Sequence, residues 1–269
     1  SEAGTLGVDA RALDAWLSET ARVTDDGCVN VRTGAPIRAL MVMHVFGHPC
    51  DVDGLCEVAS RWKLTLIEDA AEGLGSCWQG EHVGGRGLVS ALSFNGNKIV
   101  TTGGGGAVLT RDPALAARAK HLTTTARTPH QWSFVHDEVG YNYRMPNLNA
   151  ALGCAQLERL PDMLARKAEL ARRYADVFAG VEGVRLLTPR PGAEVNHWLN
   201  ALILDRPDME ARDGLLEALN GAGFMARPLW TLMHRLPMYA TCPRAPLPVA
   251  EALEASVVNI PSSARLADA

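Results

Sequence analysis

The sequence predicts an α/β fold in which a mostly parallel sheet covered by helices is followed by a smaller α/β unit. Apolar runs of strand length alternate with amphipathic helical segments along the first half of the chain. After Gly183 the pattern changes, and shorter strand-like runs alternate with helices. With 269 residues and 47% apolar side chains, the chain can bury a substantial core.

The first half has the strand–helix–strand order of a parallel sheet. Residues 9–20 and 51–63 have the spacing of amphipathic helices, and Asp9 and Asp51 are suited to cap their first turns. Ligands of such sheets bind beyond the carboxyl ends of the strands, which is where Asp69 and Lys98 fall. Strands are expected at residues 37–46, 64–68, 88–94 and 107–110, and a further helix at 113–122.

The second half begins with a long helical segment. Residues 147–178 are almost continuously helical, with an interruption at Pro161, and form a natural bridge between domains. We therefore expect a large domain over residues 1–158 and a small C-terminal domain with the bridging helix over residues 159–269. The small domain is predicted to have strands at residues 184–187, 198–204, 224–227 and 257–260, and helices at 209–220 and 249–255.

The composition argues against several function classes. The formal net charge is −4, the pI is about 6.1 and there is no basic stripe, so nucleic acid is not an expected partner. Apolar stretches such as residues 39–46 are too short to cross a membrane. The six cysteines lack CxxC spacing, which predicts reduced thiols in a cytoplasmic protein and no metal site.

Lys98 is the strongest candidate for a catalytic residue. It follows the apolar run at residues 88–94 and precedes the glycines at 103–106, so a strand delivers one amine to a tight loop. Most lysines lie on the surface with the ammonium group in water. Apolar surroundings would instead lower the pKa of this amine and make it nucleophilic toward a carbonyl, as an enzyme that uses pyridoxal 5′-phosphate (PLP) requires.

Two further side chains suit the same cofactor. Asp69 follows an apolar strand, and a carboxylate there would keep the pyridine nitrogen of PLP protonated. The small residues Ala70 and Ala71 would let a flat ring lie against the backbone. Ser93 could donate its hydroxyl to a phosphate. The alternatives are a turn cap for Asp69 and an ordinary strand serine for Ser93.

Two loops complete the candidate set. The glycines at 103–106 fit neither GxGxxG nor GxxxxGK[ST], so they do not predict a nucleotide-binding loop but allow close approach of the backbone. The segment GYNYRM at residues 140–145 places two aromatics, an amide and a guanidinium before the long helix. This segment suits an anionic ligand or, alternatively, an ordinary helix entry.

These segments together resemble the DegT/StrS-type sugar aminotransferases, which are PLP-dependent enzymes of fold type I, like aspartate aminotransferase. The match runs in order through nearly the whole chain, and its SFNGNK, TTGGGG and VVNIPSS segments are most similar to the LegC-like subgroup. That subgroup aminates nucleotide-linked 4-keto-6-deoxy sugars for bacterial surface glycans. The matching segments are IEDAAE at residues 67–72, LSFNGNK at 92–98, TTGGGG at 101–106, GYNYRM at 140–145, AALGCAQL at 150–157 and RPLWTLM at 227–233.

The resemblance implies individual roles. Lys98 would bind PLP as a Schiff base and, once released, carry the proton between the substrate carbon and the cofactor. Asp69 would pair with the pyridine nitrogen, Ala71 would pack on one face of the ring, and Ser93 would bind the phosphate. Asn142 would reach the phosphate of the neighbouring subunit's cofactor, which implies a homodimer with shared active sites.

The resemblance gives less definite roles to Glu72 and to four candidate substrate-binding residues. Glu72 stands where many relatives have Gln or His near the phenolic oxygen of the cofactor, and an ionised carboxylate there would repel a phenolate. Tyr143 and Arg144 are candidates for substrate binding. Trp230 and His234 could lie near the sugar, although a structural role for His234 is the favoured alternative.

The resemblance also implies a segment ahead of Ser1, with a phosphate-binding turn at a helix start and an aromatic residue that covers the second face of the ring. We therefore expect the chain to be part of a longer protein and to bind PLP poorly by itself.

The predicted reaction is a ping-pong transfer of an amino group from L-glutamate to the keto sugar. A relative that dehydrates sugars has His in place of the lysine, so Lys98 argues against that activity. The alternative from another class is a non-catalytic or regulatory protein of the same fold. Such a protein would not need both Lys98 and Asp69.

Overall fold

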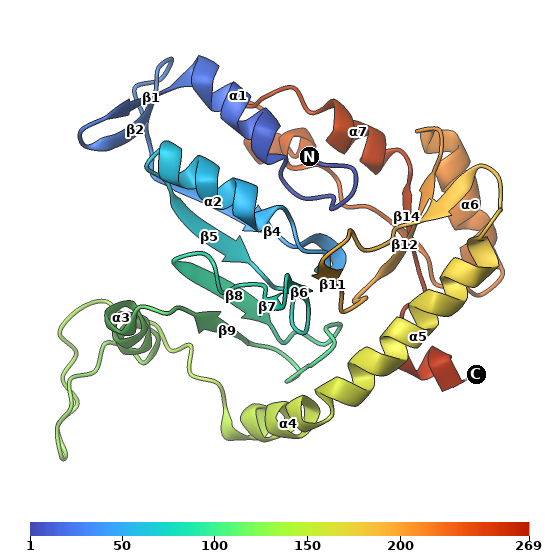
Figure 1. Ribbon diagram of the computed structural model, residues 1–269. Coiled ribbons are helices and arrows are strands. Elements are labelled where there is room, and N and C mark those ends of the chain that lie inside the picture. Colours follow the sequence, from blue (N-terminus) through green and yellow to red (C-terminus); the bar gives the residue numbers. More distant parts are fainter. Residues whose placement is uncertain (269) are drawn as a thin grey trace.

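The computed structural model describes residues 1–268, in which two α/β units are joined by the helices α4 and α5 (Figure 1). The helices are α1 Ala10–Thr20, α2 Val52–Arg61, α3 Pro113–Thr123, α4 Asn147–Glu158, α5 Leu160–Phe178, α6 Met209–Gly221 and α7 Pro248–Glu254, with short 3-10 helices η1 Val45–Gly47, η2 Met233–Arg235, η3 Pro237–Tyr239 and η4 Ala264–Asp268. The strands are β1 Ala21–Thr24, β2 Gly27–Asn30, β3 Pro36–Ile37, β4 Ala39–Met43, β5 Thr65–Asp69, β6 Cys77–Trp78, β7 Glu81–His82, β8 Val89–Ser93, β9 Gly106–Leu109, β10 Val184–Leu186, β11 Ala193–Glu194, β12 Asn200–Leu204, β13 Arg227–Pro228 and β14 Val257–Ile260.

The main sheet has the strand order β4-β5-β8-β9. β4, β5 and β8 are parallel, so the predicted mostly parallel sheet is confirmed. β9 runs antiparallel to β8, because no helix intervenes between these two strands to return the chain to the starting edge.

The two faces of this sheet differ. α1 and α2 cover one face, where Leu17, Leu55 and Val42 belong to a buried apolar cluster (Figure 1). Asp9 and Asp51 cap these helices by accepting hydrogen bonds from the N–H groups of Ala12 and Gly54, as predicted.

The other face of the sheet is open to solvent in this chain. Met41 of β4 points there and is 65% exposed. The prediction of one buried strand over residues 37–46 is therefore wrong, since β4 spans only Ala39–Met43 and alternates between exposed and buried positions. A single covered face gives the period-two burial pattern of a half-buried strand.

The helical bridge is broken once. α4 and α5 meet at Arg159, and Pro161 occupies the first turn of α5, where its missing N–H has no helical partner to lose. The predicted interruption at Pro161 thus becomes a new helix start.

The second unit has a four-stranded antiparallel sheet of order β10-β12-β14-β13, with α5 and α6 packed against it. β14 has the predicted bounds of residues 257–260. The strand predicted at 224–227 is displaced to Arg227–Pro228, and Phe224 is 57% exposed. Because proline cannot donate a hydrogen bond, Pro228 suits this edge position.

The two units share an apolar cluster that includes Phe46, Trp198 and Val257. β11 pairs with β6 of the first unit before the chain enters β12. Residues 195–199 therefore pass beside the first unit. Within residues 1–268 no helix has the length and apolar character needed to span a membrane.

Candidate active site

Strand register brings two predicted residues to one edge of the open face. Asp69 ends β5 opposite Ala91 of β8, and Ser93 lies two residues further along β8 on the same face. A cavity of about 390 Å³ opens there, lined by Asp69, Ala71, Ser93 and neighbours that include Gly105 and Gly106. The structure thus brings together the three groups expected to hold a flat anionic ligand.

Asp69 has a local hydrogen bond as well as a place in the cavity. Its Oδ1 accepts from the N–H of Ala71 at 3.0 Å, so the turn-capping alternative is realised. A carboxylate accepts several hydrogen bonds, and this turn leaves capacity for a ligand. The main chain of Asp69 is fixed too, because its carbonyl accepts from the N–H of His44 at 3.1 Å.

Lys98 sits in a turn after β8, where its N–H donates to the carbonyl of Asn95 at 3.0 Å. Its side chain is only 13% exposed, and Nζ lies 3.6 Å from Oε1 of Glu72. Burial lowers the pKa of this amine, although the nearby carboxylates of Glu72 and Asp69 oppose the change. This environment differs from that of a solvated surface lysine and increases the nucleophilicity of the amine.

The amine lies next to the cavity rather than within it. Lys98 lines a narrow crevice of about 10 Å³, and Ala71 and Ser93 line both this crevice and the larger cavity. A lysine side chain has four rotatable bonds, so the amine can reach a ligand between these two residues.

Glu72 is the buried partner of Lys98. Its Oε2 accepts from the N–H of Phe46 at 2.8 Å, and the residue is only 8% exposed. Burial raises the pKa of Glu72, while the hydrogen bond from Phe46 and the charge of Lys98 act in the opposite direction. Burial therefore favours the neutral forms of both members of this pair.

Two residues that the sequence analysis missed enclose the amine. Nζ of Lys98 lies 3.9 Å from the ring centroid of Trp198, and Nε1 of Trp198 donates to the carbonyl of Asn97 at 2.8 Å. Nδ2 of Asn196 donates to the carbonyl of Glu72 at 2.6 Å. Both residues follow β11, and no local pattern in the sequence marks them as neighbours of Lys98.

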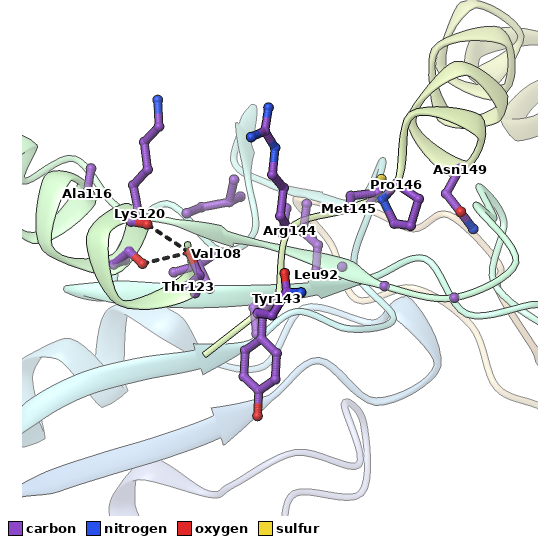
Figure 2. A pocket seen from close by; sticks show the side chains of 18 of the residues that line it. Leu92, Val108, Ala116, Lys120, Thr123, Tyr143, Arg144, Met145, Pro146 and Asn149 are labelled. Atoms are coloured by element: carbon purple, nitrogen blue, oxygen red, sulfur yellow. Dashed lines mark hydrogen bonds between the residues drawn. The ribbon is translucent and has the colours of Figure 1, made fainter. Parts of the chain in front are cut away.

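The loop at residues 140–145 lies at a different cavity. Asn142, Tyr143 and Arg144 line a space of about 920 Å³ between α3 and β9 (Figure 2). The side chains of Lys120 and Arg144 point to the same side of this space, and the ring of Tyr143 points to the other (Figure 2). Gly105 and Gly106 line both this cavity and the Asp69 cavity. Asn142 lines this cavity but not the Asp69 cavity.

The two candidate sugar contacts, Trp230 and His234, do not line the Lys98 crevice themselves. The ring of Trp230 stacks on that of Trp198, with centroids 6.4 Å apart, and Trp230 is 52% exposed. Nε2 of His234 lies 3.3 Å from Oε1 of Glu251 on α7. This ion pair supports the structural alternative for His234.

A separate group of titratable side chains joins α3 to the residues before the 140–145 loop. His121 is hydrogen-bonded to Asp137 at 2.7 Å, and Arg118 pairs with Glu138. Three of these side chains, those of His121, Asp137 and Glu138, have the ligand types of a metal site. Since the guanidinium of Arg118 already neutralises Glu138, we regard the group as an ion-pair network.

Comparison with known proteins identifies the family. The model of the DegT/DnrJ/EryC1/StrS aminotransferase family matches residues 19–269. GDP-perosamine synthase of Caulobacter vibrioides is 36% identical over 234 residues, covering 86% of this chain and 62% of that protein. GDP-perosamine synthase of Escherichia coli O157:H7 is 37% identical, covering 84% of this chain and 60% of that protein. The chain therefore spans about three fifths of the length of these relatives.

Solved structures agree with this result. The aminotransferase TlmJ of Streptoalloteichus hindustanus superposes with a TM-score of 0.79 at 28% identity, over 86% of this chain and 62% of that one. DesV of S. venezuelae superposes with a TM-score of 0.82 at 28% identity, over 98% of this chain and 66% of that one. The fold is that of the PLP-dependent sugar aminotransferases, fold type I, and the chain belongs to the DegT/DnrJ/EryC1/StrS aminotransferase family.

Proposed function

We propose that this chain carries the catalytic lysine of a PLP-dependent aminotransferase that moves an amino group from L-glutamate to a nucleotide-linked 4-keto-6-deoxy sugar. The observation that carries the proposal is the buried amine of Lys98, which lies between Glu72 and Trp198 and beside the cavity of Asp69 and Ser93. Relatives named GDP-perosamine synthase support a nucleotide sugar as the substrate.

The residues at the cavity fit PLP. Asp69 offers a carboxylate to a protonated ring nitrogen, Ala71 leaves room for a flat ring, and Ser93 offers a hydroxyl to a phosphate. Gly106 allows close backbone approach, because a Cβ there would lie 2.3 Å from the carbonyl oxygen of Leu92. A side chain at that position would therefore disturb the strand pair that borders the cavity.

The side chains have complementary tasks in this proposal. PLP, when bound, supplies an electron sink for the negative charge that develops at the reacting carbon. Lys98 attaches the cofactor and, when free, moves a proton to or from that carbon. Asp69 keeps the ring nitrogen protonated by pairing with it. Glutamate leaves as its keto acid, and the keto group of the sugar becomes an amine.

The burial of Glu72 explains how a carboxyl group could stand near the phenolic oxygen of the cofactor. An ionised carboxylate near the phenolic oxygen of the cofactor would repel it, whereas burial raises the pKa of Glu72 and favours the neutral acid. A neutral carboxylic acid donates one hydrogen bond. We propose that Glu72 is a hydrogen-bond donor to this oxygen when the cofactor is present.

The loop at residues 140–145 suits a role between subunits. Asn142 lines the neighbouring cavity and not the cavity of its own Asp69. We propose a homodimer in which Asn142 reaches the cofactor phosphate of the partner subunit, with Tyr143 and Arg144 toward the substrate.

We further propose that the protein acts in the cytoplasm, in the biosynthesis of surface glycans. We also propose that the two domains divide between residues 158 and 159, beside the break between α4 and α5 at Arg159.

The proposal predicts loss of turnover in Lys98→Ala. Parent and variant are each prepared as the full natural gene product that contains this chain and incubated with PLP, L-glutamate and a panel of nucleotide-linked 4-keto-6-deoxy sugars. The amino sugar is quantified by mass spectrometry. The parent should form product, and Lys98→Ala should form none beyond one equivalent per site, because no other lysine lines the crevice. Repeated turnover by Lys98→Ala would refute the assignment.

A regulatory role is the second candidate. A relative from Saccharopolyspora erythraea, 35% identical over 83% of this chain, is named a sensory transduction protein of erythromycin biosynthesis, EryC1. The same incubation separates the two functions, because an aminotransferase changes the visible absorbance of bound PLP when L-glutamate is added. A protein that binds PLP but gives no such change, and no amino sugar, would favour the regulatory role.

A further inference from the structure

We propose that Trp198 is the positioning residue for the amine of Lys98, and that its indole holds the free amine at the mouth of the crevice. This inference rests on the proposed function, since it assigns Lys98 the role of the reacting amine. The indole of Trp198 contacts the amine and the loop of Lys98, and the backbone of Trp198 is itself held by hydrogen bonds.

The first contact is with the amine itself. Nζ of Lys98 lies 3.9 Å from the centroid of the Trp198 ring, within the range of a cation–π interaction. Trp198 is only 5% exposed, so its ring also removes water from one side of the amine. Glu72 occupies another position around the amine, with Oε1 at 3.6 Å from Nζ.

The second contact fixes the loop that carries the lysine. Nε1 of Trp198 donates to the carbonyl oxygen of Asn97, the residue directly before Lys98, at 2.8 Å. One side chain thus restrains both the backbone before Lys98 and the end of its side chain. The sequence separation between the bonded residues is 101, so the second unit supplies a restraint that the loop lacks locally.

The third contact fixes Trp198. Its N–H donates to Oδ1 of Asn196 at 2.9 Å, and the amide of Asn196 donates to the carbonyls of Glu72 and Leu74 at 2.6 and 2.9 Å. The carbonyl of Trp198 accepts from Nζ of the buried Lys167 at 3.2 Å. Trp198 is therefore tied at its N–H, its carbonyl and its indole.

These contacts form a closed path. It runs from Glu72 to Lys98, from Lys98 to Trp198, from Trp198 to Asn196, and from Asn196 back to Glu72. Such a path determines where the amine rests when nothing is attached to it. A rigid resting place near the cavity reduces the entropy that is lost when the amine reacts.

The test measures the amine directly and needs no turnover. Competitive acetylation with acetic anhydride, read by mass spectrometry of peptides over a pH series, gives the reactivity of Lys98 relative to the exposed Lys120 of the same chain. Removing the ring in Trp198→Leu takes away the cation–π contact, which favours the charged amine, and changes the access of water and reagent to Nζ, so we expect the relative reactivity of Lys98 near neutral pH to change at least about threefold. Trp16→Phe is the control for loss of an indole elsewhere, because Trp16 packs in the cluster between α1, α2 and the main sheet.

Two gentler variants keep the test decisive if Trp198→Leu does not fold. Trp198→Phe keeps an aromatic face but loses the hydrogen bond to Asn97, and Lys167→Met loses the bond to the Trp198 carbonyl. Each should change the relative reactivity of Lys98 about twofold or more while leaving Lys120 unchanged. Unchanged reactivity of Lys98 in the folded Trp198 variants would overturn the proposal.

The failure of this inference and the failure of the proposed function give different results. If Lys98→Ala abolishes turnover while the Trp198 variants leave the acetylation of Lys98 unchanged, the function stands and the positioning role fails. If Lys98→Ala keeps turning over while the Trp198 variants alter Lys98, Trp198 still holds the amine, but the assignment of Lys98 as the reacting amine fails.

Discussion

Replacing Glu68 by Gln should destabilise the protein by about 3–5 kcal/mol at neutral pH, because the carboxylate is the hub of a buried hydrogen-bond network. Glu68 is fully buried and precedes Asp69 in β5. Its Oε2 accepts from Nε2 of His44 at 3.0 Å and from the N–H of Gly84 at 2.8 Å. Its Oε1 accepts from the N–H groups of Arg86 and Gly87 at 2.8 and 2.6 Å.

Two alternative estimates of the same loss agree on this magnitude, and they are not to be summed. Burial alone would raise the pKa of Glu68, but the hydrogen bonds from His44, Gly87 and Gly84 outweigh it and lower the pKa from 4.5 to about 2. At about 1.4 kcal/mol per pH unit, this change corresponds to roughly 3 kcal/mol. The second estimate counts the groups left without an acceptor: glutamine turns one acceptor oxygen into a donor that faces two N–H groups, and two unsatisfied buried groups cost about 2–6 kcal/mol together.

The pH dependence has a defined sign. A carboxyl group with a lower pKa in the folded state contributes stability that is fully present above its unfolded value of 4.5. That stability is lost as the pH falls from about 4.5 to about 2. The parent protein should therefore lose roughly 3 kcal/mol over this window, and Glu68→Gln should lack this loss.

The assay is urea unfolding followed by tryptophan fluorescence and circular dichroism at a series of pH values. Glu217→Gln, at an exposed position of α6, is the matched control and should change the unfolding free energy by less than about 0.5 kcal/mol. A Glu68→Gln protein that matches the parent in both stability and acid slope would refute this reasoning. In addition, because the network holds the strand end that carries Asp69, the variant should bind PLP more weakly than the Glu217→Gln control.

Two further predictions concern backbone space and buried histidine. Gly106→Ala should cost about 2–4 kcal/mol in urea unfolding, because its Cβ would meet the Leu92 carbonyl oxygen at 2.3 Å, whereas Gly104→Ala meets nothing within 4 Å and should be nearly neutral. Equal stability of the two variants would contradict the predicted clash. Burial, and then the charge of His197, lower the pKa of His48 from 6.5 to about 4, so the folded state loses stability as the pH falls through that window. His48→Asn should remove up to about 3 kcal/mol of this acid-induced loss of stability. If the unfolding free energy of His48→Asn falls with pH as steeply as that of the parent, the prediction for His48 is wrong.

The elements that local signals define were predicted well. The caps at Asp9 and Asp51 and the three β-branched residues of β14 act over a few neighbouring positions, and the structure has them where expected. The β1–β2 hairpin was missed although Asp26–Gly27 is a turn signal of the kind that joins two strands. The direction of β9 depends on how the chain returns after β8, which apolar periodicity does not encode.

The site was predictable only in part, for a physical reason. Asp69, Ser93 and Lys98 each lie at or just after a strand, so the rule that ligands bind at strand ends places them together. Trp198 and Asn196 reach the same place through tertiary packing between the two units, and nothing in their own neighbourhood in the sequence indicates it. The roles of Asp69, Ser93, Glu72 and Asn142 stay predictions until they are tested.

The bond between Trp198 and Asn97 also bears on the order in which the protein is made. A ribosome must complete the chain beyond residue 198, and the second unit must fold, before the crevice around Lys98 can close. Before that packing forms, burial does not lower the pKa of the Lys98 amine. Folding thus delays the appearance of a reactive amine until the groups that would direct its chemistry surround it.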